Sequence, residues 1–153
     1  MKKIASFTVN HDTLEKGMYI SRIDGDVITY DVRMKKPNGG DYLVMSAAHT
    51  LEHLFATYAR NSEQGDKVIY VGPMGCRTGF YFLSRDTLSY ADAIALVKES
   101  MAFTRDFEGE IPGNKKEECG NYLDHDLAGA KKLGEEMYEV LKNWTVADLQ
   151  YKE

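Results

Sequence analysis

Two of the four histidines in this 153-residue chain, His49 and His53, stand four residues apart in the stretch HTLEH, with Glu52 directly before the second. On an α-helix, side chains four positions apart project from the same face, so both imidazoles can reach one point. Two imidazoles at this spacing can bind one divalent metal ion, and the neighbouring carboxylate can exchange protons at the edge of such a site. The alternative is a pair of surface histidines on a solvated helix face. The stretch therefore predicts a metal site with a candidate acid–base group beside it.

A metal site with two histidines needs further ligands, and a thiolate is a favoured one. The chain has two cysteines, Cys76 in PMGCRTG and Cys119 in EECGN. Glycines flank Cys76, so we expect its side chain to be presented on a turn between two strands. By residue type alone, either cysteine could complete a His2Cys set, and either could be a buried, inert thiol. A single disulfide in a secreted protein is the remaining alternative.

Composition and charge narrow the class of protein. Hydrophobic residues make up 43% and charged residues 28% of the chain, as in ordinary globular proteins. The net charge of −5 offers no basic surface for nucleic acid. The opening MKKIASFTVNH lacks the apolar core of a signal peptide, and no apolar run approaches the roughly 20 residues of a membrane span. We therefore expect residues 1–153 to form a single domain in the cytoplasm, with reduced cysteines and no nucleic-acid or membrane partner.

Hydrophobic periodicity predicts four strands and three helices. The strands are expected over residues 4–9, 27–34, 67–72 and 78–84, with Pro73 and Gly75 in a hairpin-like turn between the last two. The helices are expected over about residues 47–60, from Ser89 through Met101, and over about residues 125–144. Strands mixed with helices in this order favour an α+β fold, a two-layer sandwich of a mainly antiparallel sheet with helices packed on one face.

Apolar patterning inside these elements indicates which side chains face the core. In the first helix a stripe on the side opposite the two histidines is formed by Leu51, Leu54, Phe55 and Tyr58. In the strand over residues 27–34, Ile28, Tyr30, Val32 and Met34 share one face and Arg33 lies on the other. Ser46 is the candidate N-cap of the first helix, and Ser89 with Asp92 forms a capping-box signature at the second.

Three motifs carry a resemblance to a known family. HTLEH, PMGCRTGFY and EECGN…HDLAGAKKL, in this order in a chain of this length, closely resemble the S-ribosylhomocysteine lyase (LuxS) family, and the resemblance extends from SFTVNH to the third helix. It implies that His49, His53 and Cys119 hold the metal. It also implies that Glu52 and Cys76 are the acid–base groups.

The resemblance further implies a reaction and an assembly. Members of the family cleave S-ribosylhomocysteine to homocysteine and 4,5-dihydroxy-2,3-pentanedione, the autoinducer-2 precursor, by carbonyl migration along the ribose and a final β-elimination. One divalent ion per chain acts as a Lewis acid, Fe²⁺ natively, with Zn²⁺ or Co²⁺ as alternatives. The family is homodimeric, with sites at the interface that use residues of both chains.

The substrate-binding positions are carried over from shorter stretches. By the same resemblance, SFxxxH near the N-terminus and the DxR stretch correspond to Ser6, His11 and Arg33. A guanidinium at Arg33 could hold the homocysteine carboxylate. His125 recurs in the family pattern, and we expect it to be a residue at a helix N-terminus rather than a ligand. Many members carry Asp-x-Ser before PMGC, whereas this chain has Tyr70-Val71-Gly72, so the contacts to the amino-acid end of the substrate must differ.

Two other functions use the same residues differently. H-x-x-E-H is also a signature of zinc metallopeptidases in which the glutamate is the general base and a distant acidic residue is the third ligand, but this leaves PMGCRTG and EECGN without a role. A small structural metal-binding module would need a closed site, with His125 or Cys76 as a fourth protein ligand.

Overall fold

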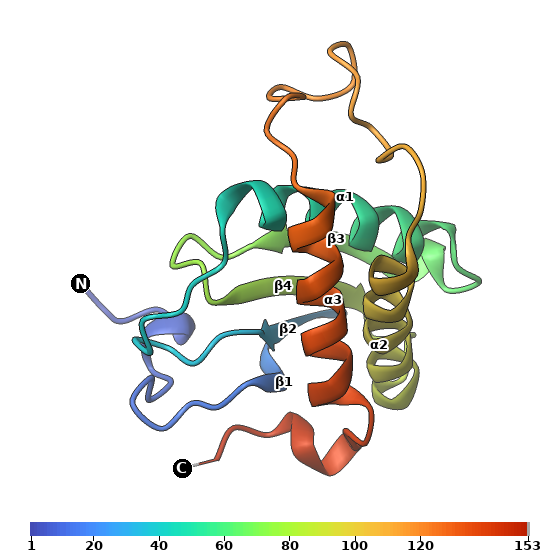
Figure 1. Cartoon of the computed structure of the whole chain (residues 1–153). Coiled ribbons are helices and arrows are strands. Elements are labelled where there is room, and N and C mark those ends of the chain that lie inside the picture. The colour runs from blue at the N-terminus through green and yellow to red at the C-terminus, as the bar shows by residue number, and fades with distance from the viewer. Residues whose placement is uncertain (153) are drawn as a thin grey trace.

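The structure, a computed structural model, describes residues 1–152. Within them, one antiparallel sheet in the order β1-β2-β4-β3 is formed by strands β1 (Gly17–Asp24), β2 (Val27–Arg33), β3 (Val68–Pro73) and β4 (Gly79–Arg85). Helices α1 (Met45–Asn61), α2 (Tyr90–Asp106) and α3 (Leu127–Leu141) cover one face of this sheet (Figure 1). The predicted α+β class, with an antiparallel sheet and helices on one face, is confirmed.

The core lies between the sheet and the helices. Side chains of a strand alternate between its two faces, and the helix-facing side carries Ile28, Tyr30 and Val32 of β2 with Phe80 and Phe82 of β4, all 3% exposed or less. Burying each such side chain contributes about 1.5–3 kcal/mol. The predicted alternation in β2 is therefore correct, and it turns Arg33 to the opposite face of the sheet.

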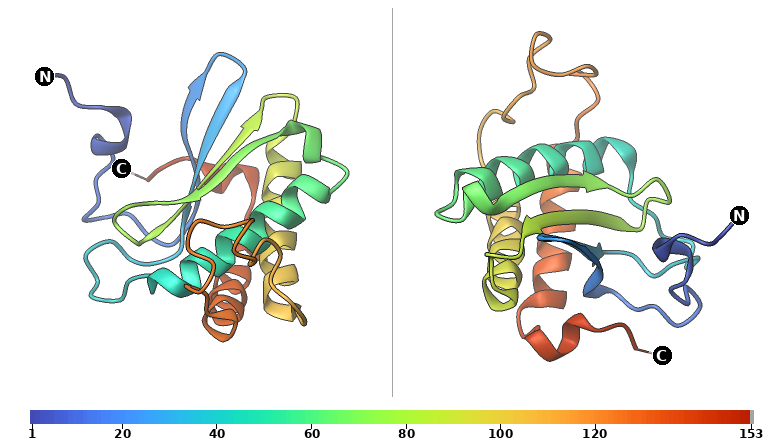
Figure 2. Two further views of the ribbon diagram at one scale, coloured as in Figure 1. Left: turned by 90° about the horizontal axis from the view of Figure 1, so that it is seen from above. Right: turned by 180° about the vertical axis from the view of Figure 1, so that it is seen from behind.

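That opposite face is covered by the two ends of the chain. The short 3-10 helix η1 (Ala5–Phe7) lies on the far side of the sheet from the helices (Figure 2). Tyr81, on the strand face that points away from the core, donates a hydrogen bond of 3.4 Å to the hydroxyl of Ser6. Near the C-terminus, Tyr151 stacks on Tyr19 of β1 with ring centroids 5.0 Å apart. Both ends of the chain therefore supply side chains to one surface of the sheet.

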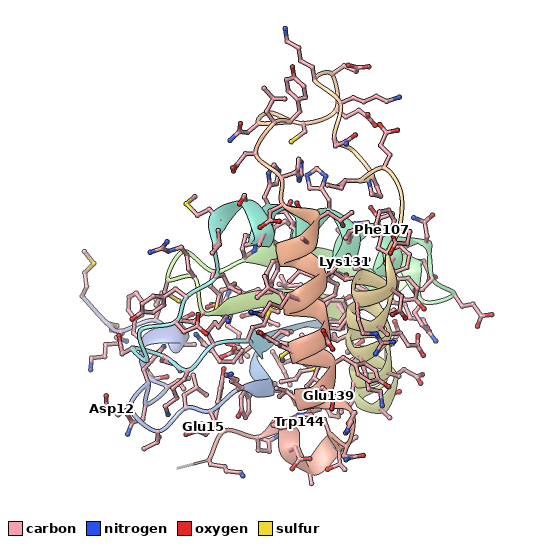
Figure 3. The ribbon with its side chains drawn as sticks, viewed as in Figure 1. Asp12, Glu15, Phe107, Lys131, Glu139 and Trp144 are labelled. Atoms are coloured by element: carbon pink, nitrogen blue, oxygen red, sulfur yellow. The ribbon has the colours of Figure 1, made fainter. Side chains whose placement is uncertain are left out.

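Helix α1 packs through the stripe that its sequence predicts. Leu51, Leu54 and Phe55 are fully buried, Tyr58 is half-buried, and the Phe55 ring stacks on Phe82 at 6.0 Å between centroids. The opposite side of the helix is crossed by the long loop over residues 107–126, which leaves α2 and returns to α3 (Figure 1). At the base of this loop Lys131 of α3 forms an ion pair of 2.7 Å with Glu108, the residue after Phe107 (Figure 3).

The N-terminal residues correct one prediction. Residues 4–9 do not form a strand, because their backbone turns into η1, with Phe7 N–H donating to the carbonyl of Ile4 and the Thr8 hydroxyl donating to that of Ala5 at 2.7 Å. The first strand of the chain is instead β1, which was not predicted from the sequence. Its pairing register with β2 shifts between Ile20 and Arg22, and this irregularity breaks the alternation that would have revealed it.

The helix ends agree in part with the predicted caps. The first helix begins at Met45 with Val44 as N-cap, so the Ser46 prediction is wrong. The second is capped by Ser89 as predicted, since its hydroxyl accepts the Asp92 N–H at 3.1 Å, but within residues 1–152 the Asp92 carboxylate makes no reciprocal bond to Ser89, so the capping box is only half formed. The third is shorter than predicted and is capped by Asp126. Within residues 1–152, no helix is long and apolar enough to cross a lipid bilayer.

The two serines provide a matched stability test. Replacing Ser89 by Ala should lower the free energy of unfolding by about 1 kcal/mol, because the N–H of Asp92 loses its acceptor. Ser46→Ala should change it by less than about 0.5 kcal/mol, because no cap is lost. Urea denaturation followed by circular dichroism, at one protein concentration, measures both. Equal losses for the two variants would contradict the assigned caps.

Candidate active site

Four side chains of types that can bind a metal ion, two from α1 and two from the loop over residues 107–126, meet above α1. His49 and His53 project one turn apart from the side of α1 opposite its core stripe, Cys119 comes from the loop over residues 107–126, and His125 lies just before α3. One ligand atom from each lies within 4.8 Å of the others. The Cys119 sulfur is 3.4 Å from Nε2 of His49 and 3.9 Å from Nε2 of His53. The predicted His49, His53 and Cys119 are therefore together in space.

The orientation of both α1 histidines is fixed by the same loop. Nδ1 of His49 donates to the carbonyl of Asp124 at 2.7 Å, and Nδ1 of His53 donates to the carbonyl of Pro112 at 2.7 Å. Because a carbonyl oxygen only accepts, each Nδ1 carries the ring proton and each Nε2 keeps its lone pair. Gly113, with φ of 71°, lets the backbone lie against the His53 ring, since a Cβ there would be 3.2 Å from Nδ1. Both lone pairs are thus turned toward the cysteine sulfur.

His125 is the fourth member of this group. Its ring stacks on that of His49 with centroids 4.1 Å apart, and its Nδ1 is 2.9 Å from the hydroxyl of Thr50, which also accepts the Asp126 N–H. Its Nε2 is buried and has no hydrogen-bond partner within residues 1–152. Burial, followed by the nearby rings of His49 and His53, lowers the pKa of His125. His125 was expected at a helix N-terminus rather than as a ligand; it lies directly before Asp126, the N-cap of α3, and its ring also joins the donor group.

The donor set fits a divalent metal ion. An ion with tetrahedral bonds of about 2.0 Å to nitrogen and 2.3 Å to sulfur separates these two donors by roughly 3.5 Å. The two sulfur–nitrogen distances, 3.4 and 3.9 Å, lie close to this value. Imidazole and thiolate ligands suit Fe²⁺, Co²⁺ and Zn²⁺ alike, so the donor types do not select one of them.

Glu52 lies beside the metal-ligating group. It lines a cavity of about 500 Å³ together with His49 and Asp124. The strand turn at Met74 and Gly75 forms the other wall of this cavity. A carboxylate in this position faces any molecule that enters next to His49, as the HTLEH spacing predicts.

A second cavity, of about 290 Å³, holds the remaining predicted site residues. Its lining includes Ser6, His11, Arg33 and Cys76. Met74 and Gly75 line this cavity as well, so the two cavities adjoin at the β3–β4 turn. The expectation that this turn presents Cys76 is correct, since the residue is exposed there. Nδ1 of His11 donates to the carbonyl of Val9 at 2.8 Å, which leaves its Nε2 as an acceptor.

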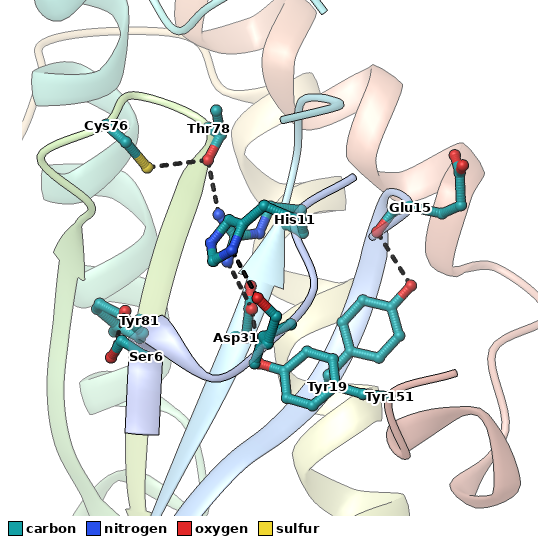
Figure 4. A network of polar contacts seen from close by, with 11 residues as sticks. Ser6, His11, Glu15, Tyr19, Asp31, Cys76, Thr78, Tyr81 and Tyr151 are labelled. Atoms are coloured by element: carbon teal, nitrogen blue, oxygen red, sulfur yellow. Dashed lines mark hydrogen bonds and ion pairs between the residues drawn. The ribbon is translucent and has the colours of Figure 1, made fainter. Parts of the chain in front are cut away.

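Three polar residues of this cavity, Asp31, Thr78 and Tyr151, were not predicted as site residues from the sequence (Figure 4). Arg33 is 4% exposed and donates through NH2 to Asp31 and through NH1 to Thr78, each at 2.7 Å. Asp31 also accepts a hydrogen bond of 2.7 Å from the hydroxyl of Tyr151. The spacing Asp-x-Arg on a strand predicts that Asp31 and Arg33 share one face. No local sequence pattern predicts that Tyr151 contacts Asp31.

The whole sequence places the chain in a family. The family model described as S-Ribosylhomocysteinase (LuxS) matches residues 4–147, which include all three motifs and both cavities' central residues. This chain belongs to the LuxS family.

Relatives of this LuxS chain are similar along their entire length. It is 46% identical over 157 positions to a protein of Phocaeicola vulgatus, covering 99% of this chain and 98% of the relative. It is 45% identical over 158 positions to one of Clostridium acetobutylicum, covering 100% of both. A protein of Porphyromonas gingivalis is 45% identical over 157 positions, with 99% of each chain covered. All three are named S-ribosylhomocysteine lyase.

One LuxS position noted from the sequence has a packing explanation. Tyr70 is 54% exposed and its side chain lies across Gly72, where an added Cβ would be 2.3 Å from the phenol oxygen. The aromatic side chain therefore occupies the place of a Cβ at residue 72 and would have to turn toward solvent if a larger residue stood there. Neither residue lines the two cavities.

The donor group leads to a test of metal content. We expect one divalent ion per chain after anaerobic purification, and loss of most of it in Cys119→Ala, because the thiolate donor is removed. Cys76→Ala should keep the parental content, and His125→Gln should lower the metal affinity by about 10–100-fold, as expected for a residue beside the ligands. Elemental analysis with competitive chelation measures both quantities. Loss of metal from Cys76→Ala with retention in Cys119→Ala would mean that the two thiol roles are exchanged.

Proposed function

We infer that this chain is an S-ribosylhomocysteine lyase, a carbon–sulfur lyase that cleaves S-ribosylhomocysteine to homocysteine and 4,5-dihydroxy-2,3-pentanedione. The observation that carries this conclusion is the LuxS match over residues 4–147, together with relatives of that name aligned from end to end. The grouping of HTLEH with the cysteine of EECGN agrees with it. A peptidase would leave the PMGCRTG cavity without a function.

His49, His53 and Cys119 are the proposed ligands of one divalent ion. Their donor atoms converge, and two backbone carbonyls hold the imidazoles in the tautomer that a ligand requires. Three protein ligands leave a position open, and an ion held there supplies Lewis acidity to oxygen atoms of the substrate. Fe²⁺ is the expected native ion, and Zn²⁺ or Co²⁺ fits the same donors.

His125 raises the alternative of a closed, structural site. Its Nε2 is unpartnered within residues 1–152 and belongs to the converging group, so it could be a fourth protein ligand. We favour the open site, because both adjoining cavities would be unused in a structural module. Chelation separates the two, since a structural site unfolds when its ion is removed, whereas an open site loses turnover first.

Cys76 and Glu52 are the proposed proton-transfer groups. They line the two adjoining cavities, one on each side of the Met74–Gly75 turn. Moving a carbonyl along a sugar requires removing a proton from one carbon and returning a proton to its neighbour, so two groups placed on different sides of the substrate suit this reaction. The final β-elimination needs one of them to remove a proton again before homocysteine leaves.

Ser6, His11 and Arg33 are the proposed substrate contacts. All three line the cavity of Cys76, and this shared location supports the assignment. The NH1 and NH2 groups of Arg33 already donate to Thr78 and Asp31, while its buried Nε has no partner within residues 1–152. A carboxylate at this end of the substrate would therefore meet a guanidinium whose charge is largely balanced by Asp31. We therefore expect Ser6 and His11 to contribute more to substrate binding than they would beside an arginine with no ion-pair partner.

The roles of the two proton-transfer groups are tested by turnover. Cys76→Ala and Glu52→Gln should each lower kcat by about 10²–10⁴-fold with the metal still bound, because each removes a proton-transfer group and keeps the ligands. Homocysteine release, followed with a thiol reagent, is the measurement. Glu135→Gln on the exposed side of α3 is the matched control and should keep the parental rate. Parental turnover in Cys76→Ala would remove that residue from the mechanism.

We further propose that residues 1–153 act as a single catalytic domain in the cytoplasm, as a homodimer with its sites at the interface. Each cavity is lined by a highly exposed apolar side chain, Phe7 at 69% in one and Met45 at 67% in the other. Apolar side chains exposed together commonly mark a surface that a partner covers. A second copy of the chain is the proposed partner, with neither nucleic acid nor membrane involved.

Assembly is tested by charge placed on this surface. The parent should sediment as a dimer, and Met45→Glu should shift it toward monomer with loss of turnover, because a carboxylate would be buried in the contact. Val146→Glu, at another exposed apolar position away from both cavities, should leave the dimer intact. A monomeric parent with full activity would contradict both the dimer and the shared sites.

A further inference from the structure

Thr78 links the guanidinium of Arg33 to the thiol of Cys76 (Figure 4). Its side chain is 3% exposed. The hydroxyl oxygen is 2.7 Å from NH1 of Arg33 and 3.1 Å from the sulfur of Cys76. The polarity of these two contacts decides what the hydroxyl does to the thiol.

The contact with Arg33 has only one direction. A guanidinium donates and cannot accept, so the Thr78 oxygen is the acceptor there. The hydroxyl must give its own proton to another group, and within residues 1–152 the Cys76 sulfur is the acceptor that lies in reach. If the thiol donated instead, the buried hydroxyl proton would have no acceptor, at a cost of about 1–3 kcal/mol. The satisfied arrangement is Arg33 to Thr78 to Cys76, each donating to the next.

The first donor in this series cannot turn away. NH2 of Arg33 is ion-paired with Asp31 at 2.7 Å, and both side chains are 5% exposed or less. The same oxygen of Asp31 accepts the Tyr151 hydroxyl at 2.7 Å. Asp31 and Tyr151 therefore hold the guanidinium in place and fix the direction of the series.

We propose that Thr78 is a positioning residue for Cys76, whose hydroxyl donates a hydrogen bond to the sulfur and thereby favours the thiolate over the thiol. The proposal rests on the function proposed above for Cys76 as a proton-transfer group. A hydrogen bond to a charged acceptor is roughly twice as strong as one to a neutral acceptor, so a fixed donor stabilises the anion more than the thiol. It also holds the sulfur at one side of the cavity, facing the space beside Ser6 and His11.

Replacing only Thr78 keeps every other titratable or charged group around the thiol, and of these only Arg33 loses a hydrogen bond, that of NH1. These groups are His11, Asp31, Arg33, Tyr42, Tyr81 and Tyr151, which line the same cavity, and Arg77, the residue after Cys76. A change in the ionisation of Cys76 on removing the Thr78 hydroxyl can then be attributed to that hydroxyl.

The test is the pH profile of alkylation at Cys76. Metal-loaded protein is treated with iodoacetamide at a series of pH values, and modification of the Cys76 peptide is followed by mass spectrometry. In Thr78→Val the pH of half-maximal rate should rise by about one unit, with a lower rate on the acidic side of the profile and an unchanged plateau at high pH. Thr78→Ser should restore the parental profile, because it keeps the hydroxyl.

Thr104→Val is the matched control. Thr104 is fully buried and donates to the carbonyl of Ser100 at 2.9 Å on α2, so it also loses a buried hydroxyl without touching the cavity. It should have the parental profile. If valine perturbs the turn, Thr78→Ala can be compared with Thr78→Ser in the same way.

The outcomes separate this proposal from the proposed function. A parental pH profile of alkylation in both Thr78→Val and Thr78→Ala would overturn the Thr78 proposal. A rate that is lower by the same factor at every pH would also overturn it, because it would indicate altered access to the thiol alone. Homocysteine release by Cys76→Ala tests the role of the thiol independently. If that variant stays active, the proposed function fails even where the Thr78 hydrogen bond is present.

Discussion

Helix α1 is fixed in the fold by Leu51, Leu54 and Phe55, which are fully buried, and the Phe55 ring packs on Phe80 and Phe82 of β4. Rotating the helix by one residue would expose this stripe and lose several kcal/mol of burial. Because the helix cannot rotate, His49, Glu52 and His53 are held on the side away from the stripe. The directions of three site residues thus follow from the packing of three apolar ones, and the loop over residues 107–126 then adds the remaining donors.

A comparable constraint acts on the sheet. Strand β2 buries Ile28, Tyr30 and Val32 toward the helices, so the intervening Asp31 and Arg33 must lie on the face that the chain ends cover. Burial of an ion pair is unfavourable unless its hydrogen bonds are met, and here Thr78 and Tyr151 supply two of them. Substituting Asp31 or Arg33 would leave a buried charge without its partner. The group is therefore rigid, which suits a cavity wall that must hold a thiol in place.

Local patterns in the sequence predicted the elements whose side chains follow a regular period. The stripe of α1, the alternation of β2 and the Ser89 cap needed only spacing, whereas β1 was missed because its pairing shifts beyond Ile20. The candidate metal donors could be predicted, since HTLEH and the two cysteines contain them and the family resemblance assigns their roles. The hydrogen bond from Tyr151 to Asp31 joins residues 120 positions apart, and no local pattern reports such a contact. The approach of His125 to His49 likewise depends on how the long loop returns to α3.

The two backbone carbonyls that hold His49 and His53 lie near opposite ends of one loop, at Asp124 and Pro112, with Cys119 between them. This segment has no regular secondary structure, so its order depends on a few anchoring points rather than on a ladder of backbone hydrogen bonds. An ion bound to α1 and to Cys119 would close the segment into two shorter loops and reduce its conformational entropy. An ion held there for the proposed reaction would then also protect the segment from proteases, and its removal by a chelator would let trypsin cut after the exposed Lys115 and Lys116 while the sheet and helices remain folded.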